Sequence, residues 1–411
     1  MRLTRVDLEE FRCYRRTTLS VPDAGLRIFG RNASGKTSLL EAVYLMATMR
    51  SPRASLEREM INWESAVEYA LPPYARVRAD VMEEGEAREI EVVLAVDEGR
   101  PQGNAVRKRV KLDGRARRAL DAVGTLKVVL FAPEDLSLVL GAPSVRRRYL
   151  DISISQIDHT YLQALSHYGR VLEQRNSLLK DLARRPRTGE ASADEQLAFW
   201  DGEIITRGSY LVAARLRYLH EVERRATLEF DALARTDAEL GLRYTGTISL
   251  PDAAIERVVT GTMGDAQALV SRAFEADLRR GREDELRRGI TLVGPHRDDV
   301  RFLLGGRELS SYGSRGQQRL AVVATKLAEL SEVMALAGER PVLLLDDVLS
   351  ELDPVHQERL LTALGVAQCQ LLITATDRAL LDRPSLSRLP LMEARTGELL
   401  PVDDVPRRNE E

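Results

Sequence analysis

The sequence predicts an α/β fold in which a mixed sheet and an antiparallel β subdomain are joined to a separate helical domain. Three observations lead to this expectation. Short runs that alternate apolar and polar residues fill much of the first 118 residues, the hydrophobic period changes from two to between three and four from about residue 145, and a wholly apolar run stands at Val342 to Leu345. A short run that is apolar at every position is typical of a strand buried on both faces.

Alternating runs predict the strands of the first part of the chain. The segments are RLTRVDLEEF, RRTTLSV, YARVRADVMEE, REIEVVLAVDE and RVKLDGRARR, with LRIF as a shorter, more apolar run among them. Glu84-Gly85 and Asp113-Gly114 supply hairpin-like turns. We therefore expect an antiparallel sheet with one exposed face. Further strand-like runs, GLRYTGTISL, GITLVG and DVRFLL, stand between residues 240 and 304.

Heptad-like spacing predicts two helices in the middle of the chain. Leu165, Leu172 and Leu179 recur every seventh residue, and a second apolar series runs from Leu197 to Val222 beyond the polar segment RRPRTGEASADE. Two such helices joined by a flexible turn form an antiparallel hairpin. The series are too short for a long coiled-coil arm.

Composition limits the classes of protein that the chain can represent. It has 411 residues and a formal net charge of −3, which argues against a generally basic protein that coats nucleic acid. Neither a signal peptide nor a membrane-spanning run is visible, so we expect a cytoplasmic protein with no membrane partner. Cys13 and Cys369 are the only cysteines and have no metal-like spacing, so we expect buried thiols rather than zinc ligands.

Basic residues gather in two places despite the acidic balance. The segment VRKRVKLDGRARR, residues 106–118, contains one acidic residue among seven arginines and lysines, and Arg146, Arg147 and Arg148 are consecutive. Each cluster has two possible interpretations, a solvated surface or a set of phosphate contacts.

The segment GRNASGKT, residues 30–37, has the spacing of a phosphate loop. Glycines let backbone N–H groups turn toward a phosphate, Lys36 supplies positive charge, and Thr37 supplies a hydroxyl for Mg²⁺. An ordinary glycine-rich turn is the alternative, but the apolar strand before it and the helical segment after it favour the phosphate loop. The residues expected to line the nucleotide are Gly30, Arg31, Asn32, Ala33, Ser34, Gly35, Lys36, Thr37 and Ser38.

Two carboxylates, Asp346 and Asp347, directly follow the apolar run near the end of the chain, in RPVLLLDDVLSELD. Ligands bind at the carboxyl edge of a parallel sheet, where the phosphate loop also begins. We expect Asp346 to meet the metal carried by Thr37, and Asp347 to polarise an attacking water as a general base.

A second anion-accepting turn lies between these motifs. In SYGSRGQQRLAVVATKLAEL, the residues from Gly313 to Gln317 form a glycine-rich turn that opens an amphipathic helix. The ordered set GRNASGKT, GSRGQQ, LLLDD and SELD resembles the ATP-binding-cassette head of the SMC and double-strand-break-repair ATPases. Within them, EEFRCYR, FAPEDLSLVLGAPSVRRRYLD, TLVGPHRDDV and SYGSRGQQRL are similar to the RecF-like family of bacterial recombination mediators, over the chain to about residue 377.

The resemblance implies an ATPase whose two heads pair head to tail. Lys36, Thr37 and Asp346 match the positions that hold ATP and Mg²⁺ within one subunit. Ser314 and Gly316 match the signature positions that contact the γ-phosphate held by the partner subunit. The implied catalytic set is Asp347, Lys36 and Ser314. Other matching positions are Arg12, a basic residue near the phosphates, and Ser350 and Asp353 of SELD, a loop at the dimer interface.

The chain departs from the cassette pattern at three places. The usual catalytic glutamate is replaced by Asp347, a shorter carboxylate, which suggests slow hydrolysis. The switch histidine is absent from LLITATD, where only Thr374 or Thr376 could replace it. FAPEDL stands where a glutamine loop is expected, so Glu134 and Asp135 are candidates for its role.

The resemblance also implies an arrangement of domains and a set of partners. Residues 1–145 and 284–411 would form the ATPase head, 146–283 the helical domain, and 311–318 the signature loop at their junction. RecF-like proteins bind double-stranded and gapped DNA as ATP-dependent homodimers and act with RecO and RecR to place RecA. A transporter cassette, a cohesin-type ATPase and a metabolic P-loop kinase are the alternatives. The helical insertion, the lack of a long coiled coil and the signature loop, respectively, argue against them.

Overall fold

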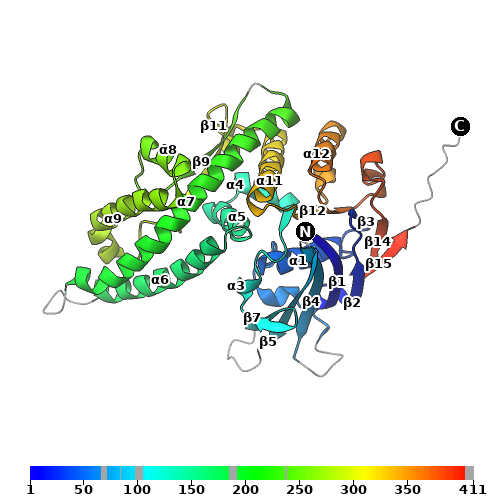
Figure 1. The fold of residues 1–411 in the computed structure, drawn as a ribbon, viewed down its shortest axis with the longest axis horizontal. Helices are drawn as coiled ribbons and strands as arrows, with labels where there is room; N and C mark the ends of the chain where they lie inside the picture. Colours follow the sequence, from blue (N-terminus) through cyan, green and yellow to red (C-terminus); the bar gives the residue numbers. More distant parts are fainter. Residues whose placement is uncertain (66–71, 84, 98–104, 185–191, 237, 403–411) are drawn as a thin grey trace. The chain divides into compact units, whose positions relative to one another are not determined.

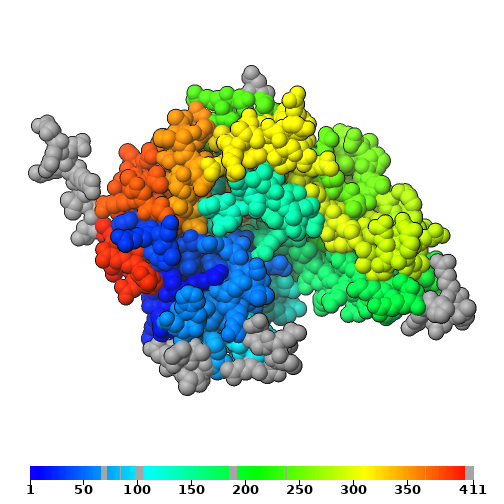
Figure 2. Space-filling model, turned by 180° about the vertical axis from the view of Figure 1, so that it is seen from behind, coloured from blue at the N-terminus to red at the C-terminus, as the bar shows by residue number. Residues whose placement is uncertain are grey.

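The computed structural model describes residues 1–65, 72–83, 85–97, 105–184, 192–236 and 238–402. The chain divides into two compact units, one of Met1–Asp135 with Glu329–Glu411 and one of Leu136–Ala328. Figure 2 shows the first unit as adjoining blue and red surfaces, because it combines the beginning and the end of the chain. Residues 284–328, expected in the head, pack in the second unit, since the strand Asp299–Leu304 pairs there with Leu240–Thr245.

The first unit contains a six-stranded antiparallel sheet with the strand order β2-β1-β4-β5-β6-β7. This confirms the predicted sheet, because the alternating segments become its strands and expose one face. The Asp113-Gly114 turn has positive φ at both residues, 52° and 75°, as a two-residue hairpin requires, whereas Glu84 of the other turn lies outside the described residues. The strands are β1 (Arg2–Phe11), β2 (Tyr14–Ser20), β4 (Tyr74–Glu83), β5 (Glu86–Val96), β6 (Val106–Leu112) and β7 (Arg115–Arg117).

A second six-stranded sheet of the first unit has the order β15-β14-β3-β13-β12-β8. All pairs are parallel except β14 with β15. The apolar run predicted as a central strand is β12, which is buried at all five positions. The strands are β3 (Gly25–Phe29), β8 (Val128–Phe131), β12 (Val342–Asp346), β13 (Leu371–Ala375), β14 (Leu391–Arg395) and β15 (Glu398–Val402).

Helix α1 (Lys36–Thr48) is the centre of the hydrophobic core of this unit. Its apolar residues, among them Leu39, Val43 and Met46, are wholly buried and belong to one cluster with residues of both sheets, such as Val77 and Leu344. A helix that is apolar on nearly every side is stable only when it is surrounded. This packing fixes the start of α1, and hence the phosphate loop, against both sheets. Other helices of the unit are α3 (Ala119–Ala122) and α12 (Pro354–Ala367), with short 3₁₀ turns η1 (Glu57–Met60), η2 (Pro133–Leu136), η3 (Val348–Glu351), η4 (Arg378–Leu380) and η5 (Pro384–Leu386).

The second unit is mainly helical, as expected, and α6 and α7 lie side by side in it (Figure 1). Both helices were predicted, and the polar segment between them lies mostly outside the described residues. Ser192 begins α7 with a capping box to Glu195. The elements are α4 (Ser137–Leu140), α5 (Pro143–Ser155), α6 (His159–Arg184), α7 (Ala193–Ala234), α8 (Asp252–Thr260), α9 (Met263–Arg288), α10 (Leu309–Tyr312) and a small sheet of β9 (Leu240–Thr245), β10 (Asp299–Leu304) and β11 (Arg307–Glu308). The boundary between the units falls within α11 (Arg315–Ala337).

The predicted strand GITLVG, residues 289–294, is wrong, because this segment is irregular. Side chains rather than a neighbouring strand bind its backbone: Asn176 Oδ1 accepts from Thr291 N, and Glu285 Oε1 accepts from Leu292 N. Gly294, with φ of 131°, adopts a conformation that other residues avoid. An apolar run with β-branched residues can therefore be irregular where side chains replace the strand ladder.

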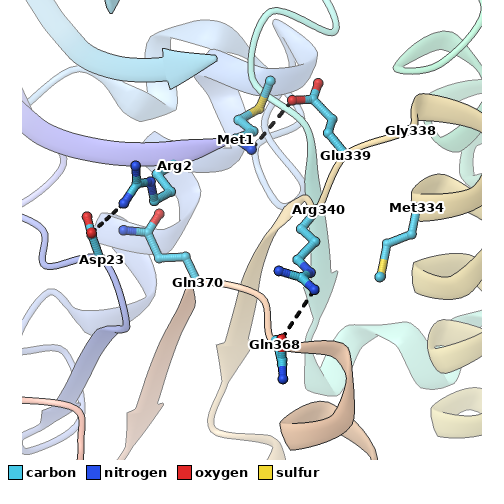
Figure 3. Close-up of a pocket in the computed structure, with 9 residues that line it drawn as sticks. All are labelled: Met1, Arg2, Asp23, Met334, Gly338, Glu339, Arg340, Gln368 and Gln370. Atoms are coloured by element: carbon cyan, nitrogen blue, oxygen red, sulfur yellow. Dashed lines mark hydrogen bonds and ion pairs between the residues drawn. The ribbon is translucent and has the colours of Figure 1, made fainter. Parts of the chain in front are cut away.

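A cavity of about 610 Å³ lies in the first unit at the amino ends of β3, β12 and β13, away from the phosphate loop (Figure 3). Its charged groups pair within it. Arg2 binds Asp23, the amino group of Met1 lies 3.5 Å from Glu339, and Arg340 donates to Gln368. Asp23 and Glu339 thus balance Arg2 and the amino group of Met1, whereas the partner of Arg340 is a neutral amide.

The described helices and the two cysteines bear on two predictions from the sequence. Among the described helices, none has the length and apolar character needed to cross a membrane. Both cysteines are free thiols, with Cys369 buried and Cys13 partly exposed.

Candidate nucleotide-binding site

The loop between β3 and α1 requires glycine at two of its positions. Gly35 has φ of 112°, and a Cβ there would lie 2.8 Å from Tyr14 Oη and 2.9 Å from Cys13 Sγ. A Cβ at Gly30 would lie 2.4 Å from the carbonyl oxygen of Ala394. Gly35 is therefore needed for backbone geometry and close packing, and Gly30 for close packing, and the backbone N–H groups at the start of α1 are left to face an anion.

Lys36 is buried at the start of α1, and its Nζ donates to Gly30 O at 2.7 Å and to Arg31 O at 2.9 Å. Burial lowers the pKa of Lys36, and the carboxylates of Asp347 and Asp346 act in the opposite direction. Burial of a positive charge is unfavourable, and a bound polyphosphate would offset it. The ammonium is thus held inside the loop at the point where the sequence predicts phosphate.

Ser34, like Lys36, is a buried polar residue of the loop that a ligand could bind. Its Oγ is buried and has no hydrogen-bond partner within the part of the chain that the structure describes. Buried hydroxyls are normally hydrogen bonded, so an orphan in this loop is a position that a ligand oxygen can satisfy.

Thr37 and Asp346, separated by 309 positions in the sequence, meet as predicted. Thr37 Oγ1 donates to Asp346 Oδ1 at 2.9 Å, and Thr374 Oγ1 donates to the same oxygen at 2.8 Å. Burial raises the pKa of Asp346, and the hydrogen bonds from Thr374 and Thr37 oppose this shift. A cation at Asp346 would favour its ionised form.

The oxygen ligands at this point fit Mg²⁺. A hydroxyl and one carboxylate are hard ligands, and Mg²⁺ normally takes few protein ligands and completes its shell with phosphate and water oxygens. No cluster of three or more His, Cys, Asp or Glu side chains suited to a metal is found among the described residues. The donor set therefore suits an ion bound together with a nucleotide.

Asp347 follows β12 in the left-handed region, with φ of 51°. Its N–H donates to Thr374 O at 3.2 Å and Oγ1 at 3.1 Å, and its Oδ1 accepts from Thr376 N at 3.2 Å. Aspartate tolerates this conformation better than most residues. The two threonines proposed in place of the missing switch histidine thus both contact the carboxylate pair, Thr374 through its side chain and Thr376 through its backbone.

Arg12 is engaged away from the loop. Its Nε and Nη2 donate to the two carboxylate oxygens of Glu41 at 2.8 and 2.7 Å, and its Nη1 donates to Glu59 O at 2.6 Å. A contact between Arg12 and phosphate stays a prediction. The sequence interpretation missed Glu41, although an acidic residue inside the apolar helix segment TSLLEAVYLMATM was a usable signal.

The predicted signature residues lie in the second unit, where α11 begins. Ser314 Oγ accepts from Gln317 N at 3.2 Å, and Ser314 N donates to Gln317 Oε1 at 2.9 Å, so the pair forms a capping box. Gly316 is exposed, and a Cβ there would meet only Ser314 Oγ, at 4.0 Å. Packing within the chain therefore does not explain why this first-turn residue is glycine.

The remaining candidates have local structural partners. Asp353 caps α12 by accepting from Val355 N at 3.0 Å and His356 N at 3.1 Å. Ser350 Oγ donates to Asp347 O at 2.7 Å, which links SELD to the catalytic candidate. Glu134 pairs with Arg53 and, in addition to burial, helps to raise the pKa of Asp346, and Asp135 Oδ2 accepts from Ala132 N. A glutamine-loop role for either residue stays a prediction.

Comparison with known proteins supports the relationship that the motifs indicated. The family model described as "RecF/RecN/SMC N terminal domain" matches residues 2–389. The chain is 50% identical to the "DNA replication and repair protein RecF" of Thermomicrobium roseum, over 98% of this chain and all of that protein. It is 32% identical to the protein of that name from Bacillus subtilis, over 97% of this chain and all of that protein. The chain belongs to the RecF family.

Solved structures confirm the fold class for this RecF-family chain. It resembles a structure described as "the recombination mediator protein RecF-ATPrS in RecFOR pathway", with a TM-score of 0.80 and 27% identity over 98% of both chains. An Smc head domain from Pyrococcus furiosus, at 16% identity and a TM-score of 0.51, covers 97% of this chain and 95% of that one and shares only the fold. The ATP-binding-cassette head fold with a mixed sheet, an antiparallel β subdomain and a helical domain is therefore confirmed.

Proposed function

We propose that this chain is a slow ATPase that binds DNA in an ATP-dependent manner during recombinational repair and replication. The observation that carries this proposal is the contact between Thr37 and Asp346 beside Lys36, within a chain of the RecF family. Phosphate loop, metal ligands and a candidate base meet at one edge of the parallel sheet, which is the arrangement that phosphoryl transfer needs.

Within one subunit, Lys36 and the backbone N–H groups of the loop bind the phosphates of ATP. Thr37 and Asp346 hold Mg²⁺, which neutralises phosphate charge. Asp347 accepts a proton from the attacking water. Its side chain is one carbon shorter than glutamate and is also held by Thr376 N–H, so it reaches less far toward that water, and hydrolysis is slow.

Ser314 and Gly316 act on the nucleotide of a second copy of this chain. The support is the glycine at position 316, since glycine is a poor helix former and no contact among the described residues requires it here. A ligand that approaches the helix start closely explains its presence. ATP between two heads then makes the homodimer dependent on nucleotide.

The DNA partner and the accessory proteins follow from the family. Relatives carry the name "DNA replication and repair protein RecF", and the similar solved structure is of a recombination mediator of the RecFOR pathway. We infer that the ATP-bound dimer recognises duplex and gapped DNA, including duplex to single-strand junctions, and acts with RecO and RecR to help load RecA.

The test is a DNA-binding titration with ATP, ADP or no nucleotide on duplex, single-stranded and gapped substrates at one stated salt concentration, since phosphate contacts make affinity depend on salt. We expect the highest affinity with ATP and gapped DNA, and loss of the ATP effect in Lys36→Met. Equal binding in all nucleotide conditions would contradict the proposal.

A further inference from the structure

Strand β6 exposes a row of cations along one face of the antiparallel sheet. Arg107, Arg109 and Lys111 are exposed, whereas Val110 and Leu112 between and beside them are buried. This alternation follows from the two-residue period of a strand. The exposed row therefore belongs to the outer face of the sheet and not to the core.

Strand β7 forms the end of this sheet (Figure 1), and its Arg115 and Arg117 are exposed, but they pair with Leu112 and Val110 and so lie on the opposite face from Arg107 and Arg109. Throughout the part of the chain that the structure describes, neither they nor Arg107 and Arg109 make a hydrogen bond or ion pair. We call the two arginines on the outer face, Arg107 and Arg109, the arginine edge.

The middle of the same sheet is different, because its charges compensate one another. Arg76 Nε lies 2.7 Å from Glu91, and Arg78 lies 2.7 Å from Glu89. Lys111, although exposed, also lies 2.7 Å from Glu91. The charges in the middle of the sheet are thus balanced, whereas those of the arginine edge are not.

The register explains why the edge is not compensated. Arg107 pairs with Ala95 and Arg109 with Val93 across β5 and β6, so an apolar residue stands where β4 and β5 place acids elsewhere. The excess charge is therefore built into the sequence pattern of β5 and does not result from a chance choice of side-chain conformations.

The other basic cluster of the chain is structural. In the second unit, Arg146 holds both carboxylate oxygens of Asp299, at 2.6 and 2.9 Å, and Arg147 donates to Asp298 O at 2.7 Å. Those guanidinium groups therefore bind partners within the fold. Of the two clusters in the sequence, only residues 106–118 present free cations.

We propose that the arginine edge binds the phosphodiester backbone of DNA. The inference rests on the proposed function and names the surface that performs the binding. Guanidinium groups match phosphate oxygens in geometry and stay charged. Side chains two residues apart on a strand are about 6.7 Å apart, about twice the 3.4 Å advance per phosphate of one DNA strand, so successive arginines reach different phosphates. The contact reads no base sequence.

Protection of a sheet margin is the competing explanation, because charged side chains on an edge strand prevent pairing with other chains. The two explanations differ in the sign of side-chain charge that they require. Either sign of charge protects an edge, whereas only positive charge attracts phosphate. Reversing the charge therefore separates them.

The first experiment measures the affinity of full-length protein for duplex DNA with ATP across a salt series, for wild type and for Arg107→Gln with Arg109→Gln. Each lost phosphate contact reduces the slope of log affinity against log salt by about 0.9. We expect a slope reduced by about 1.8 and an affinity lowered roughly tenfold, with unchanged ATP affinity. An unchanged slope would overturn the proposal.

The matched control uses Arg16, an exposed residue on β2 at the opposite end of the same sheet. Arg109→Glu and Arg16→Glu change the net charge equally. We expect weaker DNA binding only for Arg109→Glu, with no change in aggregation, since the edge stays charged. Equal loss in both variants would show a general charge effect and overturn the assignment of this surface.

The experiments distinguish an incorrect assignment of the DNA-binding surface from an incorrect proposed function. If wild type binds DNA with ATP and the edge variants match it in affinity and slope, the arginine edge is wrong and the proposed function stands. If wild type binds no DNA in any nucleotide condition, both the proposed function and the proposed role of the arginine edge are wrong.

Discussion

The phosphate loop of the first unit contains a buried polar group without a partner in the described part of the chain, whereas the buried arginines of the second unit are hydrogen bonded to several partners. In the loop, Ser34 Oγ is buried without a partner among the described residues, and Lys36 binds only two carbonyl oxygens. In the second unit, Arg175 is fully buried and donates to Asp201, Thr291 and Glu285 at 2.6 to 2.9 Å. The first arrangement is complete only with a ligand, whereas the second is complete by itself.

Arg215 repeats the pattern of Arg175. Its three nitrogens donate to Tyr161 Oη, Pro295 O and Asp151 Oδ1 at 2.7 to 2.9 Å. Together the two arginines bind the irregular segment that contains TLVGPHRDD, residues 291–299. A motif that helped to indicate the family is therefore structural in this chain. The comparison between the loop and the buried arginines teaches that a binding site leaves polar groups without partners, whereas a structural network satisfies them.

The largest effect is expected from breaking the saturated network. Arg175→Met removes the nearest cation from buried Glu285, which keeps only Arg282 at 3.5 Å, so the second unit should lose about 3 kcal/mol of unfolding free energy. Urea unfolding in a Trp63→Phe background, where Trp200 of α7 is the only tryptophan, reports on this unit. Arg279→Met, which removes an exposed pair with Glu275, is the control and should cost less than about 0.5 kcal/mol. Equal losses would contradict the comparison.

Breaking the incomplete site should affect binding and not stability. Lys36→Met removes the charge that meets the phosphates, so ATP affinity should fall on the order of 100-fold, or about 3 kcal/mol. The measurement is equilibrium binding of a fluorescent ATP analogue, with Lys180→Met on the exposed side of α6 as the control. A variant that loses stability but keeps ATP affinity would make the loop lysine structural.

Acid should weaken the network of the second unit at His296. Burial lowers the pKa of His296 from its ordinary value of 6.5 to about 4, and Tyr168 Oη lies 2.7 Å from its Nδ1. Because the unfolded chain binds a proton first, stability is full above about pH 6.5 and is lost as the pH falls toward 4. Between pH 7 and 5 the loss is about 2 kcal/mol.

Comparison with His296→Gln isolates this effect from other acidic and basic groups. Urea unfolding at both pH values should show a smaller decrease in the variant than in the wild type, by about the same 2 kcal/mol. Identical pH dependence in the two proteins would mean that His296 titrates as it does in the unfolded chain.

A smaller effect on ATP binding, but a clear one on assembly, is expected for Ser314→Arg. If Ser314 acts on the nucleotide of the partner, the variant should bind ATP nearly as wild type while dimerising at least roughly tenfold more weakly. Mixing it with Lys36→Met leaves one composite site intact, so partial recovery of the dimer is expected by analytical ultracentrifugation. Loss of ATP binding by the folded Ser314→Arg monomer would argue against action across the interface.

The same comparison explains what could be predicted from the sequence. The phosphate loop and the strand before it were predictable from local glycine spacing and apolar sequence. The Thr37–Asp346 contact was predictable although it spans 309 positions, because both residues follow strands whose carboxyl ends meet at one edge of a parallel sheet. The spacing of α6 places Arg175 on the apolar stripe, seven residues after Tyr168, which was a usable signal of burial. Its partners could not be predicted, because they come from residues 201, 285 and 291. Long-range ion pairing has no periodic signal, and the incorrect strand at 289–294 has the same cause.

The most direct test of the account is the lifetime of the protein on gapped DNA after dilution into excess competitor, with ATP and Mg²⁺ present throughout. Asp347→Asn keeps the proposed metal ligands but weakens the proposed general base, so it should hydrolyse ATP more slowly and dissociate more slowly than wild type. Asp346→Asn removes the metal carboxylate and should dissociate faster. If Asp347→Asn hydrolyses slowly yet leaves DNA as fast as wild type, ATP turnover does not control release, and the proposed role of this site is contradicted.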